Sequence, residues 1–207
     1  MIKIWATAIS GMLCLALGPG LIGIYGFFVE PLSREFGVGV ALLNLGPVAL
    51  ILVPGIIAPL VGKLADRVPM RTMLLTGATL AMLALFALGL APTLGLVTLA
   101  FLGFSLGLTL YGPVVVNGLM VKSYPGREAR ALAIAAIGIS LASATLPPLV
   151  GTLLEYLDWR ATLQGLAAGL LVILWLVILL SVPSGIIGTP PAAAETAGRR
   201  SIGVRAS

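Results

Sequence analysis

The stretch that decides the fold is Pro-Leu-Val-Gly-Lys-Leu-Ala-Asp at residues 59–66, because the chain repeats it as Pro-Leu-Val-Gly-Thr-Leu-Leu-Glu at residues 148–155. Five of the eight positions are identical, and an acidic residue closes both copies. Arg71 corresponds to Arg160 at the same offset of 89 residues. The repeated unit contains three apolar segments, and an odd number of membrane spans places the second copy upside down. Inverted repeats of this kind are typical of secondary transporters.

The composition indicates an all-α integral membrane protein. Of the 207 residues, 59% are hydrophobic and 9% are charged, and the mean hydropathy is +1.16. The charge-poor runs reach the roughly 20 residues that a spanning helix needs. The chain has no His and one Cys, Cys14, which excludes intramolecular disulfides, His-based metal sites and His-based catalytic triads. The net charge of +5 does not indicate nucleic-acid binding, because the basic residues lie at the ends of the apolar runs.

Hydropathy predicts six transmembrane helices, which form two three-helix repeats at about residues 1–92 and 93–182. The predicted helices cover about residues 4–28, 39–61, 73–90, 94–121, 131–154 and 161–182. Glu30, Arg34 and Glu35 are expected in a short polar loop after the first helix. Residues 183–207, rich in Ser, Pro, Gly and Ala, are expected to form a disordered cytoplasmic tail or interdomain linker.

The basic residues predict the orientation. With the N-terminus inside, ten of the twelve Lys and Arg residues fall on the cytoplasmic side, and only Arg34 and Arg160 fall outside. This bias is the positive-inside rule, so both termini are expected in the cytoplasm of a cell or inner membrane. The inner set is Lys3, Lys63, Arg67, Arg71, Lys122, Arg127, Arg130, Arg199, Arg200 and Arg205.

The loop at residues 62–71, Gly-Lys-Leu-Ala-Asp-Arg-Val-Pro-Met-Arg, resembles the signature loop of the major facilitator superfamily in sequence and in position, after the second span. It departs from the family pattern at Pro69, where Gly is usual, and at Thr72, where a second basic residue often follows. Residues 124–134, 147–151 and 158–160 also resemble family segments. The stretch Tyr-Gly-Phe-Phe that begins at Tyr25 weakly resembles the monocarboxylate and oxalate/formate branch.

The resemblance covers about residues 4–182 and implies the N-terminal six-helix half of such a transporter. It implies secondary active transport of a small solute, with a small organic anion suggested by the branch, by alternating access against a second six-helix half. That half is expected as a missing C-terminal half, a separate chain or the other copy in a homodimer. A non-transporting membrane scaffold or partner subunit derived from such a half is the alternative. An intramembrane enzyme is not expected, because the sequence offers no clustered carboxylates, Ser/His pair or metal set, and no cofactor is expected.

The candidate site residues fall into two groups. The resemblance implies that Gly62, Asp66, Arg67 and Arg71 form a gating loop: Gly62 permits close approach of another helix, and the arginines pair with acidic groups or lipid phosphate. The alternative is a positive-inside loop with ordinary surface ion pairs.

Within the spans, the candidates for the solute cavity are polar and uncharged, because no ionisable Asp, Glu, Lys, Arg or His lies deep in any span. In the family, spans 1, 2, 4 and 5 line the cavity, which favours Tyr25, Tyr111, Asn117 and Ser140. Tyr25 and Tyr111 occupy equivalent places in the two repeats, so they are expected to face each other. Ordinary interhelical hydrogen bonding is the alternative for each.

Overall fold

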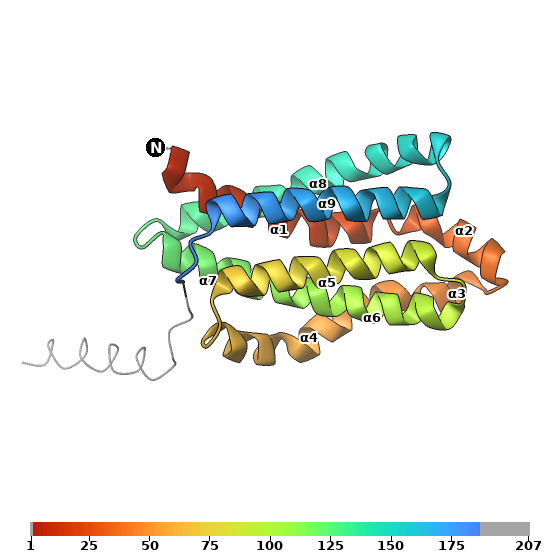
Figure 1. Cartoon of the computed structure of the whole chain (residues 1–207), viewed down its shortest axis with the longest axis horizontal. Coiled ribbons are helices and arrows are strands. Elements are labelled where there is room, and N and C mark those ends of the chain that lie inside the picture. The colour runs from red at the N-terminus through yellow and green to blue at the C-terminus, as the bar shows by residue number, and fades with distance from the viewer. Residues whose placement is uncertain (1, 187–207) are drawn as a thin grey trace, which may run out of the picture.

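The computed structural model describes residues 2–186, and all regular structure in this part of the chain is helical. Figure 1 shows the long helices side by side in one elongated bundle. The helices are α1 (Ile2–Gly23), α2 (Gly26–Phe36), α3 (Val40–Leu43), α4 (Leu45–Ala65), α5 (Met70–Leu90), α6 (Leu94–Tyr111), α7 (Pro113–Ser123), α8 (Glu128–Tyr156) and α9 (Trp159–Ser181).

Six segments are long and apolar enough to cross a membrane, which confirms the predicted fold class. We number them spans 1 to 6 in chain order. They are Trp5–Gly23 in α1, Val40–Ala65 in α3 and α4, Met70–Leu90 in α5, Leu94–Ser123 in α6 and α7, Glu128–Tyr156 in α8 and Trp159–Ser181 in α9. Their ends differ from the predicted ends by a few residues.

The prediction of a polar loop after the first helix is wrong, because α2 occupies this segment. The helix α2 is amphipathic: it buries Phe28 and Leu32, while Glu30 and Arg34 form an exposed pair one turn apart. It ends at Gly37, which adopts the left-handed conformation with φ of +63° that favours glycine. The first predicted helix therefore ends at Gly23 rather than at residue 28, and α2 continues beyond the span.

The fourth span is broken in the middle. Proline lacks a backbone N–H and disfavours the helical conformation of the residue before it. Gly112, which precedes Pro113, is accordingly extended, with φ of −81° and ψ of −162°. The helix predicted over residues 94–121 is thus two helices, α6 and α7.

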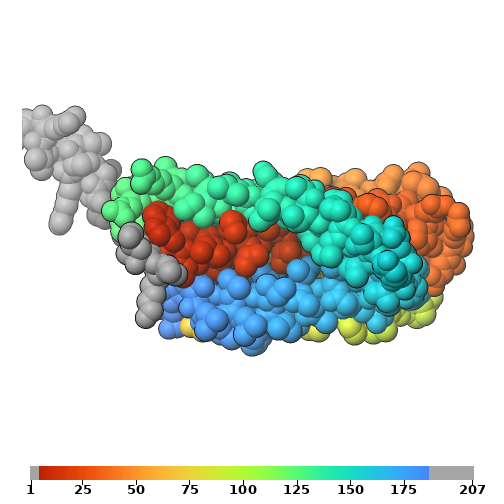
Figure 2. All heavy atoms as spheres, turned by 90° about the horizontal axis from the view of Figure 1, so that it is seen from above, coloured from red at the N-terminus to blue at the C-terminus, as the bar shows by residue number. Residues whose placement is uncertain are grey.

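The helix neighbours follow a pattern that two related repeats would produce. α1 packs on α8 and on α9, α4 packs on α6, and α5 packs on α6 and on α9. Figure 2 shows α1 seated between α8 and α9 on one face of the bundle. Exchanging spans 1, 2 and 3 for spans 4, 5 and 6 converts each of these pairs into another pair of the set. The division of the chain into two repeats at about residue 92 stays a prediction.

Small residues bring the packed helices close together. A Cβ on Gly138 of α8 would collide with the backbone oxygen of Met12 on α1, and a Cβ on Gly107 of α6 would collide with the backbone of Ala81 on α5. Close approach through glycine is a general device of membrane helix pairs. Helix α5 buries Met73, Leu74 and Ala78 among other residues.

The chain after α9 turns back onto the bundle. The carbonyl of Ile186 accepts a hydrogen bond of 2.9 Å from the N–H of Met70, at the start of α5. Residues 183–186, expected to begin a disordered tail, therefore pack at the end of the bundle that holds the signature loop. Residues 187–207 of the expected tail lie outside the described residues.

Candidate functional site

One cavity lies where the family resemblance expects a solute site. It has a volume of about 390 Å³ and is lined by residues of α1, α4, α6, α7 and α8, which belong to spans 1, 2, 4 and 5. Proline and glycine at the cavity wall, such as Gly18, Pro19, Pro54 and Gly55, replace bulkier side chains. None of the lining residues is Asp, Glu, Lys or Arg, so the cavity is apolar with a few polar groups.

Tyr111 is the notable polar residue of this cavity. It is the last residue of α6, its side chain is fully buried, and it lines the cavity together with the thiol of Cys14. Its hydroxyl has no hydrogen-bond partner among the described residues. The neighbouring Thr109 is satisfied, since its hydroxyl donates to the carbonyl of Ser105 at 2.8 Å.

The break between α6 and α7 lies in the same wall. Gly112, Pro113 and Val114 all line the cavity. The first intrahelical bond of α7 runs from the N–H of Val116 to the carbonyl of Gly112 at 3.1 Å. The N–H groups of Val114 and Val115 lie in the first turn of the helix, where no intrahelical acceptor is available.

Tyr25 lies elsewhere. Its hydroxyl donates to the carbonyl of Leu43 at 2.6 Å, and its ring packs edge to face against Phe101 with centroids 5.7 Å apart. It lines a separate and smaller cavity, of about 40 Å³, beside Phe28 and Leu32. The two tyrosines therefore do not share a site, although they match in the repeat.

The other two candidate cavity residues are exposed. Asn117 lies on α7 and Ser140 on α8, and neither belongs to the lining of the large cavity. The structure thus brings together Tyr111 and the break in span 4, and leaves Tyr25, Asn117 and Ser140 outside that group.

The signature loop joins α4 to α5. Asp66 caps the C-terminal end of α4, and the exposed Arg67 follows it. Arg71 lies in the first turn of α5, where its guanidinium donates to the carbonyl of Leu179 at 3.1 Å. A Cβ on Gly62 would meet no described atom within 4 Å, so the close approach expected there does not come from this part of the chain. The ion pairs within the described residues do not involve the loop.

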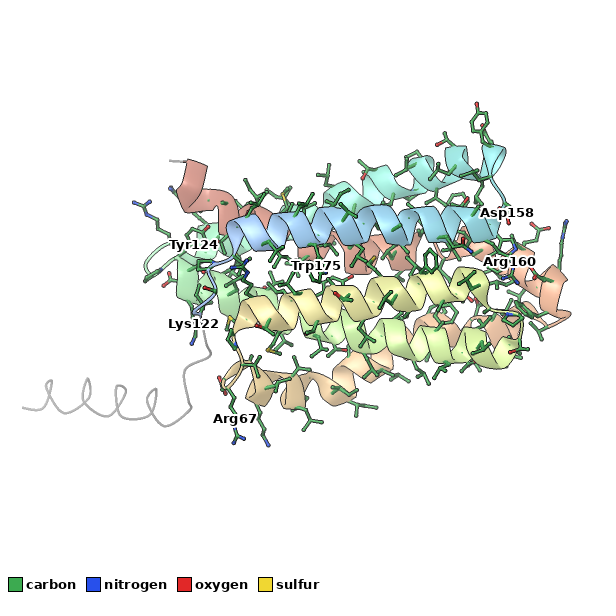
Figure 3. All side chains as sticks on the ribbon, viewed as in Figure 1. Arg67, Lys122, Tyr124, Asp158, Arg160 and Trp175 are labelled. Carbon is green, nitrogen blue, oxygen red and sulfur yellow. The ribbon has the colours of Figure 1, made fainter. Side chains whose placement is uncertain are left out.

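Arg160 makes the counterpart contact at the other end of the same helix pair, which sequence reasoning did not anticipate. Its guanidinium donates to the carbonyls of Gly89 at 3.0 Å and Ala91 at 2.8 Å, at the end of α5, and pairs with Glu35 of α2. We call this group the Arg160 clasp. Figure 3 places Arg160 and Asp158 at one end of the bundle and Arg67, Lys122 and Tyr124 at the other.

The signal for this arrangement was present in the repeat, since Arg71 and Arg160 are equivalent. Each arginine lies in the first turn of its span and donates to carbonyls at the end of the other span. Spans 3 and 6 are therefore antiparallel neighbours that are joined at both ends. Trp159 adds to the second contact, with its indole N–H donating to Glu35 at 3.1 Å and its ring 4.6 Å from the guanidinium carbon of Arg160.

Six apolar helices, of which spans 1, 2, 4 and 5 line a cavity, define an integral, multi-pass membrane protein with a transporter fold. Residues 9–205 match the Major Facilitator Superfamily, and the chain belongs to that family. It is also 31% identical over 161 residues to an uncharacterized 38 kDa protein in the 23S RNA operon of Thermoproteus tenax, covering 77% of this chain and 42% of that protein.

Two solved structures share the fold. A bacterial homolog of the human lysosomal transporter Spinster, in an inward-facing and unoccupied conformation, aligns with a TM-score of 0.69 and 15% identity over 92% of this chain. The peptide transporter POT, as an E310Q mutant, aligns with a TM-score of 0.63 and 21% identity over 98% of this chain. This chain covers 44% of the length of each. The chain therefore spans less than half the length of these relatives.

Proposed function

We propose that this chain is one six-helix unit of a secondary transporter that moves a small organic anion across the membrane by alternating access. The observation that carries the proposal is the cavity on the face formed by spans 1, 2, 4 and 5. In alternating access, one helix bundle rocks against another around a site at their interface. The cavity supplies one wall of such a site.

A second six-helix unit completes the transporter in this proposal. The face of α4 beside the cavity is apolar and unpartnered within the described chain: Ile51 and Ile56 are 66% and 75% exposed. The second unit comes from the same longer chain, from a separate chain or from a second copy. The lengths of the relatives support a second unit, because this chain matches 42% to 44% of them.

The signature loop acts as the gating element of the proposed transporter. Gly62 faces open space, and Asp66 forms no ion pair with the described cations. Both features leave the loop available to a neighbouring helix of the second unit, whose N-terminal dipole favours the carboxylate of Asp66. The loop lies at the cytoplasmic end in the orientation that the basic residues favour.

Transport by reconstituted protein tests the proposal. The assembly is purified by a tag on this chain, placed in liposomes, and supplied with labelled organic anions and their neutral analogues on one side. We expect uptake of an anion above that of empty liposomes, and its loss in Asp66→Asn with the elution profile and melting temperature unchanged. An assembly that moves no solute favours the scaffold alternative, and wild-type uptake by Asp66→Asn removes the gating role.

A further inference from the structure

The hydroxyl of Tyr111 is a buried polar group without a partner in an apolar setting. Leaving such a group unsatisfied is costly, because its desolvation is not offset by a hydrogen bond. A group of this kind in a native structure calls for a physical reason. A ligand that supplies an acceptor atom is one such reason, and Tyr111 lines the large cavity.

The N-terminus of α7 is a second, independent donor in the same wall. The helix has 11 residues, and its first turn follows the break at Gly112, which lines the cavity with Pro113 and Val114. The N–H groups in this turn lack intrahelical acceptors, and the helix dipole adds a partial positive charge there. Such a terminus favours an anionic or carbonyl oxygen.

The rest of the lining determines what else the solute carries. Leu15, Ile22, Leu50, Leu108 and Ile139 contribute apolar surface, and the lining has no charged residue to pair with a second polar group. The solute therefore needs one acceptor group and an apolar body.

We propose that the break between α6 and α7 is a binding subsite for the anionic oxygen of an otherwise apolar organic anion, with the Tyr111 hydroxyl and the first turn of α7 as donors. This inference rests on the proposed function and adds the part of the cavity that selects the solute. The hydroxyl is buried in this state, so binding requires an opening there, which helix movement in alternating access provides.

The break also places the carbonyl end of α6 beside the N-terminus of α7, and carbonyl oxygens disfavour an anion. The comparison of an anion with its amide therefore decides the charge of the group. We use labelled benzoate and benzamide as probes, because they share an apolar ring and differ in the group offered to the subsite.

Equilibrium binding is measured on the purified assembly in nanodiscs of neutral lipid. Wild-type protein is expected to bind benzoate more tightly than benzamide. Tyr111→Phe is expected to weaken benzoate binding at least roughly tenfold, in line with the loss of a hydrogen bond to a charged group. Tyr156→Phe is the matched control, since it removes a hydroxyl from a residue that is 85% exposed at the end of α8, and it should leave the affinity unchanged.

A second pair of variants tests the α7 terminus. Val114→Asp places a carboxylate in the first turn of α7. This carboxylate should abolish benzoate binding, because it occupies the donors of the subsite and repels the carboxylate of benzoate. Val114→Asn has the same shape without the charge and should retain most of the binding. Tyr111→Phe removes no internal hydrogen bond, so an unchanged melting temperature confirms that it folds.

Each outcome bears on the proposal. Equal benzoate affinity in Tyr111→Phe and wild type, or tighter binding of benzamide, overturns the subsite. Transport of another solute by an assembly that binds neither probe also overturns it and leaves the proposed function standing. Tyr111-dependent benzoate binding by an assembly that moves no solute supports the subsite and removes the proposed transport.

Discussion

Replacing Arg160 with Gln tests whether the Arg160 clasp holds spans 3 and 6 together. The substitution removes the charge and shortens the side chain, so the carbonyl of Ala91 loses its side-chain donor and that of Gly89 keeps only the amide of Gln164. These two carbonyls lie at the C-terminal end of α5, where no intrahelical donor is available. The variant also leaves Glu35 without its cationic partner.

The expected loss in free energy of unfolding is about 3 kcal/mol. A hydrogen bond from a charged donor contributes about 1.5–3 kcal/mol when it is desolvated. The side chain of Arg160 retains 25% exposure, so each of the two carbonyl bonds is assigned a value just below that range, about 1–1.5 kcal/mol. The pair with Glu35, whose side chain is 39% exposed, adds about 0.5 kcal/mol after solvent screening.

Unfolding is followed by far-UV circular dichroism during titration of detergent-solubilised protein with sodium dodecyl sulfate. Arg34→Gln is the matched control, because Arg34 forms an exposed pair with Glu30 within one helix, and such pairs contribute about 0.3–0.5 kcal/mol. Arg160→Lys should recover part of the loss, since the charge stays but the fork of two donors does not. An Arg160→Gln protein as stable as Arg34→Gln would refute the reasoning.

Three further comparisons of variants use the same unfolding assay. Arg71→Gln should cost less than Arg160→Gln, about 0.5–1 kcal/mol, because its guanidinium makes one exposed bond to the end of α9; an equal loss would contradict this. Tyr25→Phe should cost about 1 kcal/mol through its lost hydrogen bond, whereas Tyr111→Phe should be neutral or stabilising because its hydroxyl has no partner. Gly138→Ala should destabilise by 2 kcal/mol or more, roughly the cost of overpacking, because its Cβ meets backbone on α1, while Gly55→Ala meets nothing. Similar results for the two glycines would count against close packing of α1 on α8.

The number and type of the spans could be predicted because each depends on its own stretch of sequence. A run of about 20 apolar residues must satisfy its backbone internally in lipid, and a helix does so without help from the rest of the chain. The signature loop at residues 62–71 likewise carries a local pattern. The helix α2 was not predicted, because hydropathy detects long apolar runs. This helix is half polar and lies beyond the first span.

The arrangement of the site could be predicted only in part, because it depends on which helix faces which. Tyr25 and Tyr111 are equivalent in the repeat, but their hydroxyls differ. The hydroxyl of Tyr25 donates to the carbonyl of Leu43, whereas that of Tyr111 has no partner among the described residues. The partner of Tyr25 is a carbonyl at the end of α3, a short helix that hydropathy does not separate from span 2. Gly112 and Pro113 follow Tyr111 in the sequence, but hydropathy alone does not place them in the cavity wall.

The two arginines at the α2 end of the bundle both pair with acidic residues, and these pairs bear on the proposed orientation. Arg34 and Arg160 are the cations of the two described ion pairs, with Glu30 and Glu35, and Arg67 at the opposite end has no such pair among the described residues. Acidic residues contribute little to orientation, which follows the count of Lys and Arg.

The carboxylate of Glu35 therefore acts locally: it fastens α2 to the Arg160 clasp rather than setting the topology. Glu35→Gln should lower the unfolding free energy by about 0.5 kcal/mol and leave the orientation unchanged, as measured by labelling single cysteines introduced at each end of the bundle in a Cys14→Ala background. A mixed orientation in that variant would show that the acid helps to set the topology. The repeat-equivalent Arg71 forms no ion pair among the described residues.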